Sequence, residues 1–409
     1  MNKDKGVSLT GPRIYMALFS LRFTEVFWVV FLRSRGLSYA AIGLMETVFH
    51  VSSLLCEMPT GLIADRWGRK VSLAVGRALC ALSALINVSA RNPAWIAVAF
   101  ALNAISYTCH SGAFEALVYD SLPEERRGDF GKIFGDVNSV YLIGTAASGI
   151  GASILASRYS LALCYAVSIC VDICAAIVSL FLPEDLSARR AMKRSSGVLS
   201  ALGNDVKDLL TTLRAPVLRG ILMLWGVASA LSASVHMYGQ SLLEESLVPI
   251  GLVGIAGTLG NLLAVVPTRY AYKIENRFGQ IPPVIMGGMT VPFVVGILAM
   301  VPAHLNWGWR ALLIAVYLGL TVVVETAYPI MSHAVNARTG SHNRATVLSS
   351  SGMLFSVWMM VVFPLIGMAG DRFGLRWGMG LAALISLIAL LPLSTSLKRA
   401  AGDETQAQG

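Results

Sequence analysis

Long apolar runs separated by short polar connectors make up most of the chain. A helix needs about 20 apolar residues to span a bilayer, and each run is near that length. The pattern predicts twelve membrane helices, over residues 13–32, 39–62, 71–90, 94–119, 134–156, 160–182, 217–240, 248–270, 282–302, 308–332, 345–366 and 377–396. The expected fold class is therefore an all-α membrane protein.

The segment 183–216 is the only long connector between these runs, and it is rich in Ser, Arg and Lys. Apolar residues within 198–210 recur at helical spacing, which predicts an amphipathic helix on the inner leaflet. We interpret this segment as a cytoplasmic linker. It separates two six-helix bundles, one over residues 1–182 and the other over residues 217–409.

The two halves repeat each other. Three pairs of positions are related by nearly the same offset in sequence number: 66–68 with 277–279, Glu115 with Glu325, and 157–159 with 371–373. Offsets this similar at equivalent places predict a parallel repeat about the membrane normal. The second copy departs in one respect, because Asn276 stands where Asp65 is and Tyr272 where Gly61 is.

Composition and charge agree with a membrane protein. Hydrophobic residues make up 55% of the chain and charged residues 13%, whereas a soluble domain is about 25% charged. The net charge of +9 is scattered over many connectors rather than gathered on one face, which argues against nucleic-acid binding. Of the 32 Lys and Arg residues, 24 fall on the side that holds both termini, so the positive-inside rule predicts cytoplasmic termini and a multi-pass protein of the inner membrane.

Other chemistry is not indicated. The six cysteines fall in apolar runs and show neither a disulfide framework nor zinc spacing. The first apolar run lacks a following cleavage site, so we expect an uncleaved helix. The sequence shows no nucleotide-binding loop, metal cluster or nucleophile triad, so we expect no catalysis, ATP drive or cofactor. The expected partners are the bilayer, protons and a small molecule, and we expect a monomer.

One short connector stands out, residues 61–70, Gly-Leu-Ile-Ala-Asp-Arg-Trp-Gly-Arg-Lys. It holds two glycines, one carboxylate and three cations between two apolar runs. A connector this short predicts a tight cytoplasmic hairpin, whose glycines allow the two helices to approach closely.

The pattern Gly-x-x-x-Asp-Arg-x-Gly-Arg-Lys resembles the loop signature of the major facilitator superfamily. Residues 57–61 and 115–122 are also similar to those of bacterial drug and small-molecule exporters in that family. The resemblance implies two pseudo-symmetric six-helix bundles that alternate access to a site near the midplane. It also implies that the first, fourth, seventh and tenth spans line the cavity, while the third, sixth, ninth and twelfth face lipid.

The same resemblance implies that the hairpin closes a cytoplasmic gate. Asp65 would lie against the positive start of the helix near 345–347, and Arg69 would pair with Asp120. The remaining hairpin residues of this proposed gate are Gly61, Arg66, Gly68 and Lys70. The alternative interpretation is that these charges only fix the topology and solvate a loop.

Several ionisable residues lie within the predicted spans, where they are costly unless they face protein or a wet cavity. Arg22 and Glu25 are three residues apart and are expected to pair, either as a proton site or as a structural brace. Glu46, His50 and Glu57 share one helical face. They suggest a proton relay, although we favour a bracing role for Glu57 and keep satisfied interhelical groups as the alternative for the other two.

Glu325 is the strongest candidate in the second half, as a proton or substrate site, and its match with Glu115 leaves open that both are interhelical braces. Trp28, Tyr107 and Tyr317 are candidates for an aromatic cavity wall, with helix packing as the alternative. We interpret His110 and His236 as satisfied core groups. Asp172 fits none of these patterns.

One further segment bears on the direction of transport. Gly144, Gly149 and Gly151 loosely resemble the glycine-proline motif of antiporters in this superfamily, but the proline is missing. Close packing through small residues explains these glycines equally well.

The functional prediction is a secondary transporter that exports a small amphipathic molecule or drug by proton antiport. One alternative is a proton-coupled importer of a sugar, organic acid or peptide, which predicts a more polar cavity. A second alternative is a non-transporting membrane sensor, which would not need titratable groups at depth.

Overall fold

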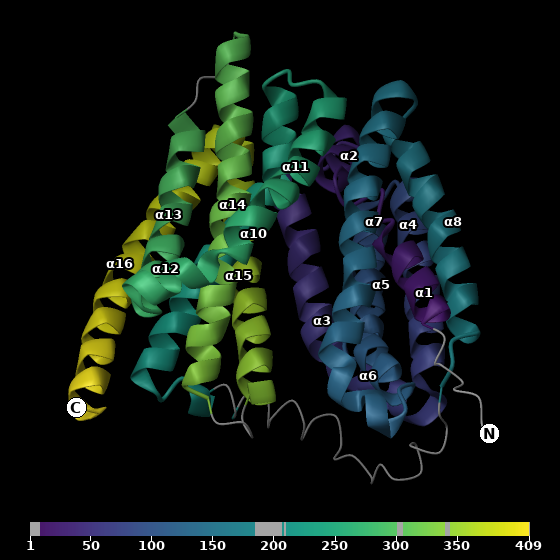
Figure 1. The fold of residues 1–409 in the computed structure, drawn as a ribbon. Helices are drawn as coiled ribbons and strands as arrows, with labels where there is room; N and C mark the ends of the chain where they lie inside the picture. The colour runs from purple at the N-terminus through teal and green to yellow at the C-terminus, as the bar shows by residue number, and fades with distance from the viewer. Residues whose placement is uncertain (1–8, 185–206, 208–209, 301–305, 340–343, 409) are drawn as a thin grey trace. The chain divides into compact units, whose positions relative to one another are not determined.

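The computed structural model describes residues 9–184, 207, 210–300, 306–339 and 344–408, and these residues contain helices and no strands (Figure 1). Most of the predicted linker, including its predicted amphipathic helix, lies outside the described residues. The first half contains α1 (Thr10–Ser20), α2 (Trp28–Ser34), α3 (Tyr39–Trp67), α4 (Arg69–Ser89), α5 (Pro93–His110), α6 (Ala113–Asp120), a 3₁₀ helix (Glu124–Asp129), α7 (Phe130–Arg158) and α8 (Leu161–Leu180). The second half contains α10 (Pro216–Glu245), α11 (Ile250–Arg269), α12 (Ala271–Phe278), α13 (Ile281–Met300), α14 (Trp307–Ala337), α15 (Arg344–Phe373) and α16 (Leu375–Gln408).

Ten of these helices are long and apolar enough to cross a membrane. The other two predicted spans, 13–32 and 94–119, are each divided into two helices, so the expectation of continuous helices there is wrong. Between α1 and α2, a series of turns replaces the helical ladder, with Glu25 N–H donating to Arg22 C=O at 3.2 Å and Phe27 N–H to Thr24 C=O at 3.1 Å. Between α5 and α6, Gly112 adopts a left-handed φ of 72° that no helix residue has. The apolar pattern runs on through both breaks and does not reveal them.

The repeat predicted from the sequence is present in the backbone. Gly68 and Gly279, which occupy equivalent positions in the two halves, follow helix ends with φ of 109° and 73°. Gly36 and Leu247 are related by the same offset, and both have positive φ. Leu247 is the one described non-glycine residue in this region of the backbone, a conformation that a branched side chain rarely adopts. The two halves therefore share these two turns.

The chain forms two compact units. Unit 1 contains residues 1–27 and 51–201, and unit 2 contains residues 28–50 and 202–409, so α3 contributes to both. Within unit 2, Asp371 caps the start of α3, because its carboxylate oxygens accept hydrogen bonds from the N–H groups of Tyr39 and Ala40, each at 2.8 Å. Gly43 allows α3 to approach α15 closely, since a Cβ there would lie 2.6 Å from the Cα of Pro364. The division into residues 1–182, 183–216 and 217–409 stays a prediction.

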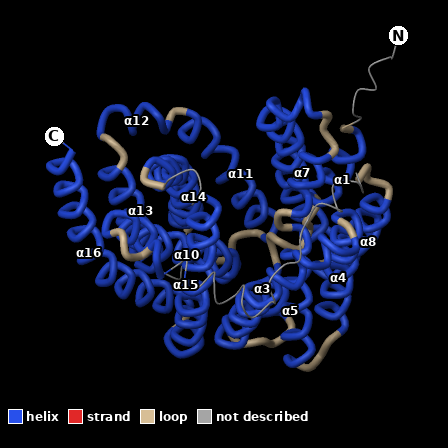
Figure 2. The backbone as a smooth tube through the Cα atoms, turned by 90° about the horizontal axis from the view of Figure 1, so that it is seen from below, coloured by secondary structure: helices blue, strands red, loops and turns tan. Residues whose placement is uncertain are grey.

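Helix α10 is the central element of unit 2. It contacts α13, α14, α15 and α16, which surround it in the end-on view of Figure 2. This position explains why small and apolar residues occupy nearly all of its circumference and why most of them are buried. A cavity for a ligand in unit 2 therefore has α10 as one wall.

Candidate functional site

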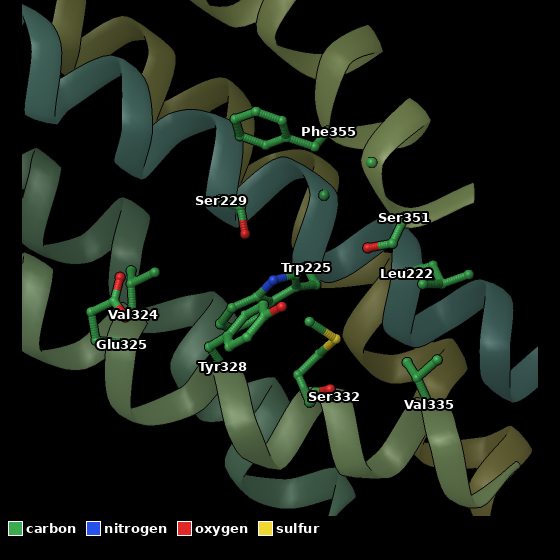
Figure 3. Close-up of a pocket in the computed structure, with 13 residues that line it drawn as sticks. Leu222, Trp225, Ser229, Val324, Glu325, Tyr328, Ser332, Val335, Ser351 and Phe355 are labelled. Carbon is green, nitrogen blue, oxygen red and sulfur yellow. The ribbon is translucent and has the colours of Figure 1, made fainter. Parts of the chain in front are cut away.

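Unit 2 contains a cavity of about 350 Å³ between α10, α14 and α15 (Figure 3). Its volume falls at the lower end of the range for small-molecule sites. The lining residues are Leu222, Trp225, Gly226, Ser229, Val324, Glu325, Tyr328, Met331, Ser332, Val335, Ser351, Gly352 and Phe355. The wall is mostly apolar, with three aromatic rings, three serine hydroxyls and one carboxylate.

Glu325 is the one charged residue of this lining. Its side chain is accessible, and among the described residues its carboxylate has neither an ion pair nor a hydrogen bond. Its equivalent in the repeat, Glu115, is also exposed and lines a shallow hollow with Arg69, Tyr119 and Asp120. Neither glutamate braces two helices within the described chain, so the interpretation of both as interhelical braces receives no support.

The aromatic residues predicted for a cavity wall do not line this cavity. Tyr317 is buried, its hydroxyl lies 3.0 Å from Nδ1 of His236, and its ring packs where a Cβ on Gly239 would lie 2.7 Å away. Trp28 stacks on Phe363 with ring centroids 6.0 Å apart. Tyr107 is half exposed on α5 in unit 1. The rings that do form the wall, Trp225, Tyr328 and Phe355, were missed, because sequence periodicity alone does not say which face of α14 meets α10.

Glu46 and His50 lie directly behind one wall of the cavity. Nε2 of His50 is 3.5 Å from Oε1 of Glu46, and its Nδ1 is 3.2 Å from Oγ of Ser356. Both side chains are buried. The ring of Phe355, which lines the cavity, makes an edge contact with His50 at a centroid distance of 5.7 Å. This pair of titratable groups is therefore separated from the cavity by a single aromatic ring.

Arg22 and Glu25 lie in the break between α1 and α2 and form the predicted ion pair, with Nη1 and Oε2 3.2 Å apart. The Glu25 side chain is 58% exposed, while Arg22 is more covered and lies over the ring of Phe19. Broken helices in membrane transporters place charged groups and free helix ends at binding sites. The pair is positioned for such a role in unit 1.

Asp172 has a partner that the sequence analysis missed. Its Oδ1 lies 2.9 Å from Nη1 of Arg77, and Nη2 of Arg77 donates to Ser106 Oγ at 3.1 Å. Arg77 is 1% exposed and lies over the ring of Phe19 at 4.7 Å. Arg77, one of the 24 cations counted on the side of the termini, is therefore a buried residue of α4 and not a connector residue. The sequence did contain a signal for this pair, because two opposite charges in separate apolar runs are expected to find each other.

The two lone histidines are satisfied core groups, as expected. Nδ1 of His110 lies 3.1 Å from the Tyr15 hydroxyl, and the His110 ring stacks on Phe19 at 3.8 Å. His236 has the Tyr317 contact already described. Gly144 and Gly151 of α7 also serve packing, because a Cβ at Gly144 would overlap the side chain of Ser20 and one at Gly151 would lie 2.9 Å from the ring of Phe23.

The hairpin at residues 61–70 joins three helices of unit 1. Gly68 takes a φ of 109°, which lets α3 end and α4 begin without a connecting loop. The guanidinium of Arg69 pairs with Asp120 at the end of α6, as the resemblance implied, and the backbone N–H of Arg69 donates to Oε1 of Glu184 at 2.6 Å. Gly61 does not serve close packing, since no described atom lies within 4 Å of a Cβ built there.

The other hairpin residues add less. Arg66 is exposed and Lys70 is partly exposed. The side chains of Asp65 and of residues 344–346 lie outside the described part of the structure, so their predicted contact stays a prediction.

The second hairpin carries a polar network that the sequence analysis also missed. Arg338, at the end of α14, donates through Nη1 to Oε1 of Gln280 at 2.8 Å and through Nε to Oε2 of Glu404 at 3.0 Å. Gln280 Nε2 in turn donates to Oε1 of Glu275 at 3.1 Å, and Nδ1 of His333 lies 2.5 Å from the same oxygen. Gln280 occupies the position in the second half that Arg69 occupies in the first, so the repeat could have predicted a polar network there.

Comparison with known proteins places the chain in a family. The sequence model of the Major Facilitator Superfamily matches residues 14–364. The uncharacterized MFS-type transporter YxaM of Bacillus subtilis (strain 168) is 30% identical over 123 residues, which are 30% of this chain and 31% of that protein.

Solved structures agree on the fold. A mutant of the nucleoside transporter NupG has a TM-score of 0.77 at 15% identity, over 97% of this chain and 100% of that one. A POT family transporter in complex with 5-aminolevulinic acid has a TM-score of 0.69 at 10% identity, over 97% of this chain and 96% of that one. This chain is therefore a multi-pass membrane transporter that belongs to the major facilitator superfamily.

Proposed function

We propose that the chain is a secondary active transporter that exports a small amphipathic molecule in exchange for protons by alternating access. The observation that carries the proposal is the unit 2 cavity, where apolar and aromatic walls surround one carboxylate without an ionic partner among the described residues. An apolar wall with a few polar groups is typical of sites for small organic ligands. Glu325 is then the group that binds the substrate and the proton in turn.

The proton-coupling part rests on the cost of charge in the membrane. An ionised carboxylate in the bilayer core is unfavourable unless water, a cation or a polar ligand compensates it. Glu325 has no such compensation from the described residues, so proton uptake is the natural response when the cavity is closed to water. Glu46 with His50, and Glu25 with Arg22, are secondary candidates for carrying the proton.

We further propose that both termini face the cytoplasm of the cell membrane, from the distribution of Lys and Arg. In that orientation the hairpin at residues 61–70 lies on the cytoplasmic side. The pairing of Arg69 with Asp120 would then hold the inner ends of α4 and α6 together in one state of the transport cycle.

Import of a more polar solute is the second candidate. It is favoured by the names of the structurally similar proteins, a nucleoside transporter and a POT family transporter in complex with a thioalcohol-conjugated peptide. The cavity favours an amphipathic ligand instead, because most of its lining is apolar and its polar groups are few: three serines, one glutamate and the polar tips of Trp225 and Tyr328.

Flux through proteoliposomes with an imposed pH gradient tests the proposal. Wild-type protein should move fluorescent amphipathic dyes in the direction opposite to the proton flow, and Glu325→Gln should make the dye flux independent of the pH gradient. Glu244→Gln, which removes an exposed carboxylate of the same unit away from the cavity, is the matched control. Gradient-independent flux in the wild type, or accumulation of nucleosides or peptides with the proton flow, would refute proton-coupled export. Absence of any flux would favour a sensor.

A further inference from the structure

We infer that the substrate of the unit 2 cavity is an organic monocation, with its positive charge at one end of a flat apolar body. The inference rests on the proposed function, because it names the class of molecule that the same cavity binds. It is carried by three features: the charge of the lining, the aromatic rings and the order of polar groups along α14.

The charge of the lining itself is negative, and no residue of the lining compensates it. Glu325 is its one ionisable carboxylate, and no Lys, Arg or His belongs to it. The described cations of α14 on either side, Arg310 and Arg338, lie about 20 Å away along the helix axis. That exceeds the distance over which charges interact strongly at physiological salt, about 8 Å. Arg338 is also engaged by Glu404.

The next titratable groups are Glu46 and His50 behind Phe355, a buried carboxylate beside an imidazole. No described lysine or arginine pairs with Glu46. An anionic ligand would therefore meet uncompensated repulsion in this cavity, whereas a cation would meet its only opposite charge.

The aromatic rings favour a cation for an independent reason. The faces of Trp225, Tyr328 and Phe355 are negative and attract cations that lie within about 6 Å. Trp225 and Tyr328 are close together, with centroids 6.3 Å apart and planes at 46°. Tyr328 follows Glu325 by three positions, so the carboxylate and this ring are neighbours on one face of α14. A positive group at Glu325 would thus contact both an ion partner and an aromatic face.

The order of polar groups sets the shape of the ligand. Glu325 lies at one end of the cavity and Ser351 toward the other, with Trp225, Tyr328 and then Ser332 between them (Figure 3). Ser332 lies two helical turns after Glu325, which is about 10 Å along the helix. The geometry fits a ligand whose charge and hydrogen-bonding group are separated by a flat apolar ring system.

One consequence concerns exchange. A proton and a monocation each neutralise the same carboxylate, so binding of one releases the other. Exchange of one proton for one monocation moves no net charge across the membrane. The carboxylate alone is then enough to couple the two fluxes.

Three probes of nearly equal shape test the inference on the full-length protein in lipid nanodiscs, with empty nanodiscs subtracted. N-methylacridinium is a cation, 9-methylanthracene replaces its nitrogen by carbon, and anthracene-9-carboxylate is an anion. The cation should bind at least ten times more tightly than the hydrocarbon, and the anion should bind more weakly still. Glu325→Gln should remove the preference for the cation and leave hydrocarbon binding unchanged, while Glu244→Gln should keep the preference. Equal affinities in the wild type, or a preference that survives Glu325→Gln, would overturn the inference.

A second pair of variants separates this inference from the proposed function. Gly352 lines the cavity and Gly319 does not, and a Cβ at either position meets no described atom within 4 Å. Gly352→Leu should therefore fill the cavity and abolish both binding and flux, whereas Gly319→Leu should not. If Gly352→Leu abolishes binding but the wild type shows no charge preference, the cavity is the substrate site, and the inference that the substrate is a monocation is wrong. If Gly352→Leu leaves binding and flux intact, the cavity is not the substrate site, and both proposals fail.

Discussion

The two hairpins of the repeat tie corresponding helix ends together, but the cation that makes the ties lies in the hairpin in the first half and at the end of α14 in the second. In the first, the residue after the left-handed glycine is Arg69, and it is held by Asp120 at the end of α6 and by Glu184 after α8. In the second, the equivalent residue is the neutral Gln280, and the cation is Arg338 at the end of α14, which also binds Glu404 of α16. The repeat therefore preserves which elements are tied together, while the side chains that tie them have been exchanged.

The same contrast holds inside the bundles. Unit 1 contains the buried pair of Arg77 and Asp172, but the repeat places Gly288 and the buried Ser386 at the equivalent positions of the second half. The two predicted spans of the first half that are broken correspond to the intact helices α10 and α14. The buried ion pair and the two broken spans belong to the first half, whereas the helices that form the cavity with its single carboxylate belong to the second.

The largest expected effect comes from making the first half resemble the second at the buried pair. Asp172→Ser leaves Arg77 buried without an ionic partner, which costs about 3–5 kcal/mol of stability when one member of a buried pair is removed. The yield of folded protein and the thermal unfolding midpoint in detergent measure this. Replacing both charges, with Arg77→Met and Asp172→Leu, should recover most of the loss, because apolar residues of similar volume often substitute for buried pairs. A double variant as unstable as the single one would show that Asp172 does not stabilise the protein through its pair with Arg77.

The next effect tests whether the two hairpin glycines are equivalent. Gly68 and Gly279 have φ of 109° and 73° with extended ψ, a region open almost only to glycine. Gly68→Ala and Gly279→Ala should each lower the free energy of unfolding by about 1–3 kcal/mol. Gly61→Ala is the internal control, because Gly61 lies within α3 with open space beside it, and alanine should be neutral or slightly stabilising there. Unequal losses at Gly68 and Gly279, measured by urea unfolding in micelles, would mean that the two turns differ despite their shared backbone.

Much of this fold could be predicted from the sequence, because its signals are linear. Apolar runs located the ten helices that can cross a membrane and the two regions in which the helix is broken, and similar offsets located the repeat and the turns at Gly68 and Gly279. Glu325 was identified because a carboxylate in an apolar run needs an explanation. The hairpin pair of Arg69 and Asp120 followed from a family signature.

The rest depends on contacts between elements distant in the sequence. Arg77 and Asp172 lie in different apolar runs, and only the packing of α4 against α8 brings them together. Tyr317 was assigned to the cavity wall and Tyr328 was not, because the rotation of α14 against α10 is set by packing. The breaks around Arg22 and at Gly112 leave the apolar pattern unchanged, so hydropathy cannot report them.

A smaller effect, on transport rather than stability, tests directly whether the side chains of the first hairpin can be replaced by those of the second. Arg69→Gln imitates the second hairpin at one position and removes the pair with Asp120. A partly exposed pair is worth about 1 kcal/mol at most, so the balance between transport states, and with it the flux, should shift by about fivefold. Adding Asp120→Arg supplies a cation at the end of α6 that can reach Glu184, as Arg338 reaches Glu404. Flux should then recover at least partly, and a double variant worse than the single would break the analogy between the hairpins.

The smallest expected effect concerns the second hairpin alone. Arg338→Ala removes the bonds to Gln280 and Glu404, and because these groups are partly exposed the loss of stability should be about 0.5–1 kcal/mol. Amide hydrogen exchange should therefore rise in α12, at the start of α13 and in the last turns of α16, which the Arg338 network connects to α14, and not in the rest of α13. Arg399→Ala removes an exposed cation of α16 without a described partner and should leave exchange unchanged. Uniform exchange across unit 2 in Arg338→Ala would instead mean that the network supports the whole bundle, and that the second hairpin, unlike the first, is not a local tie between helix ends.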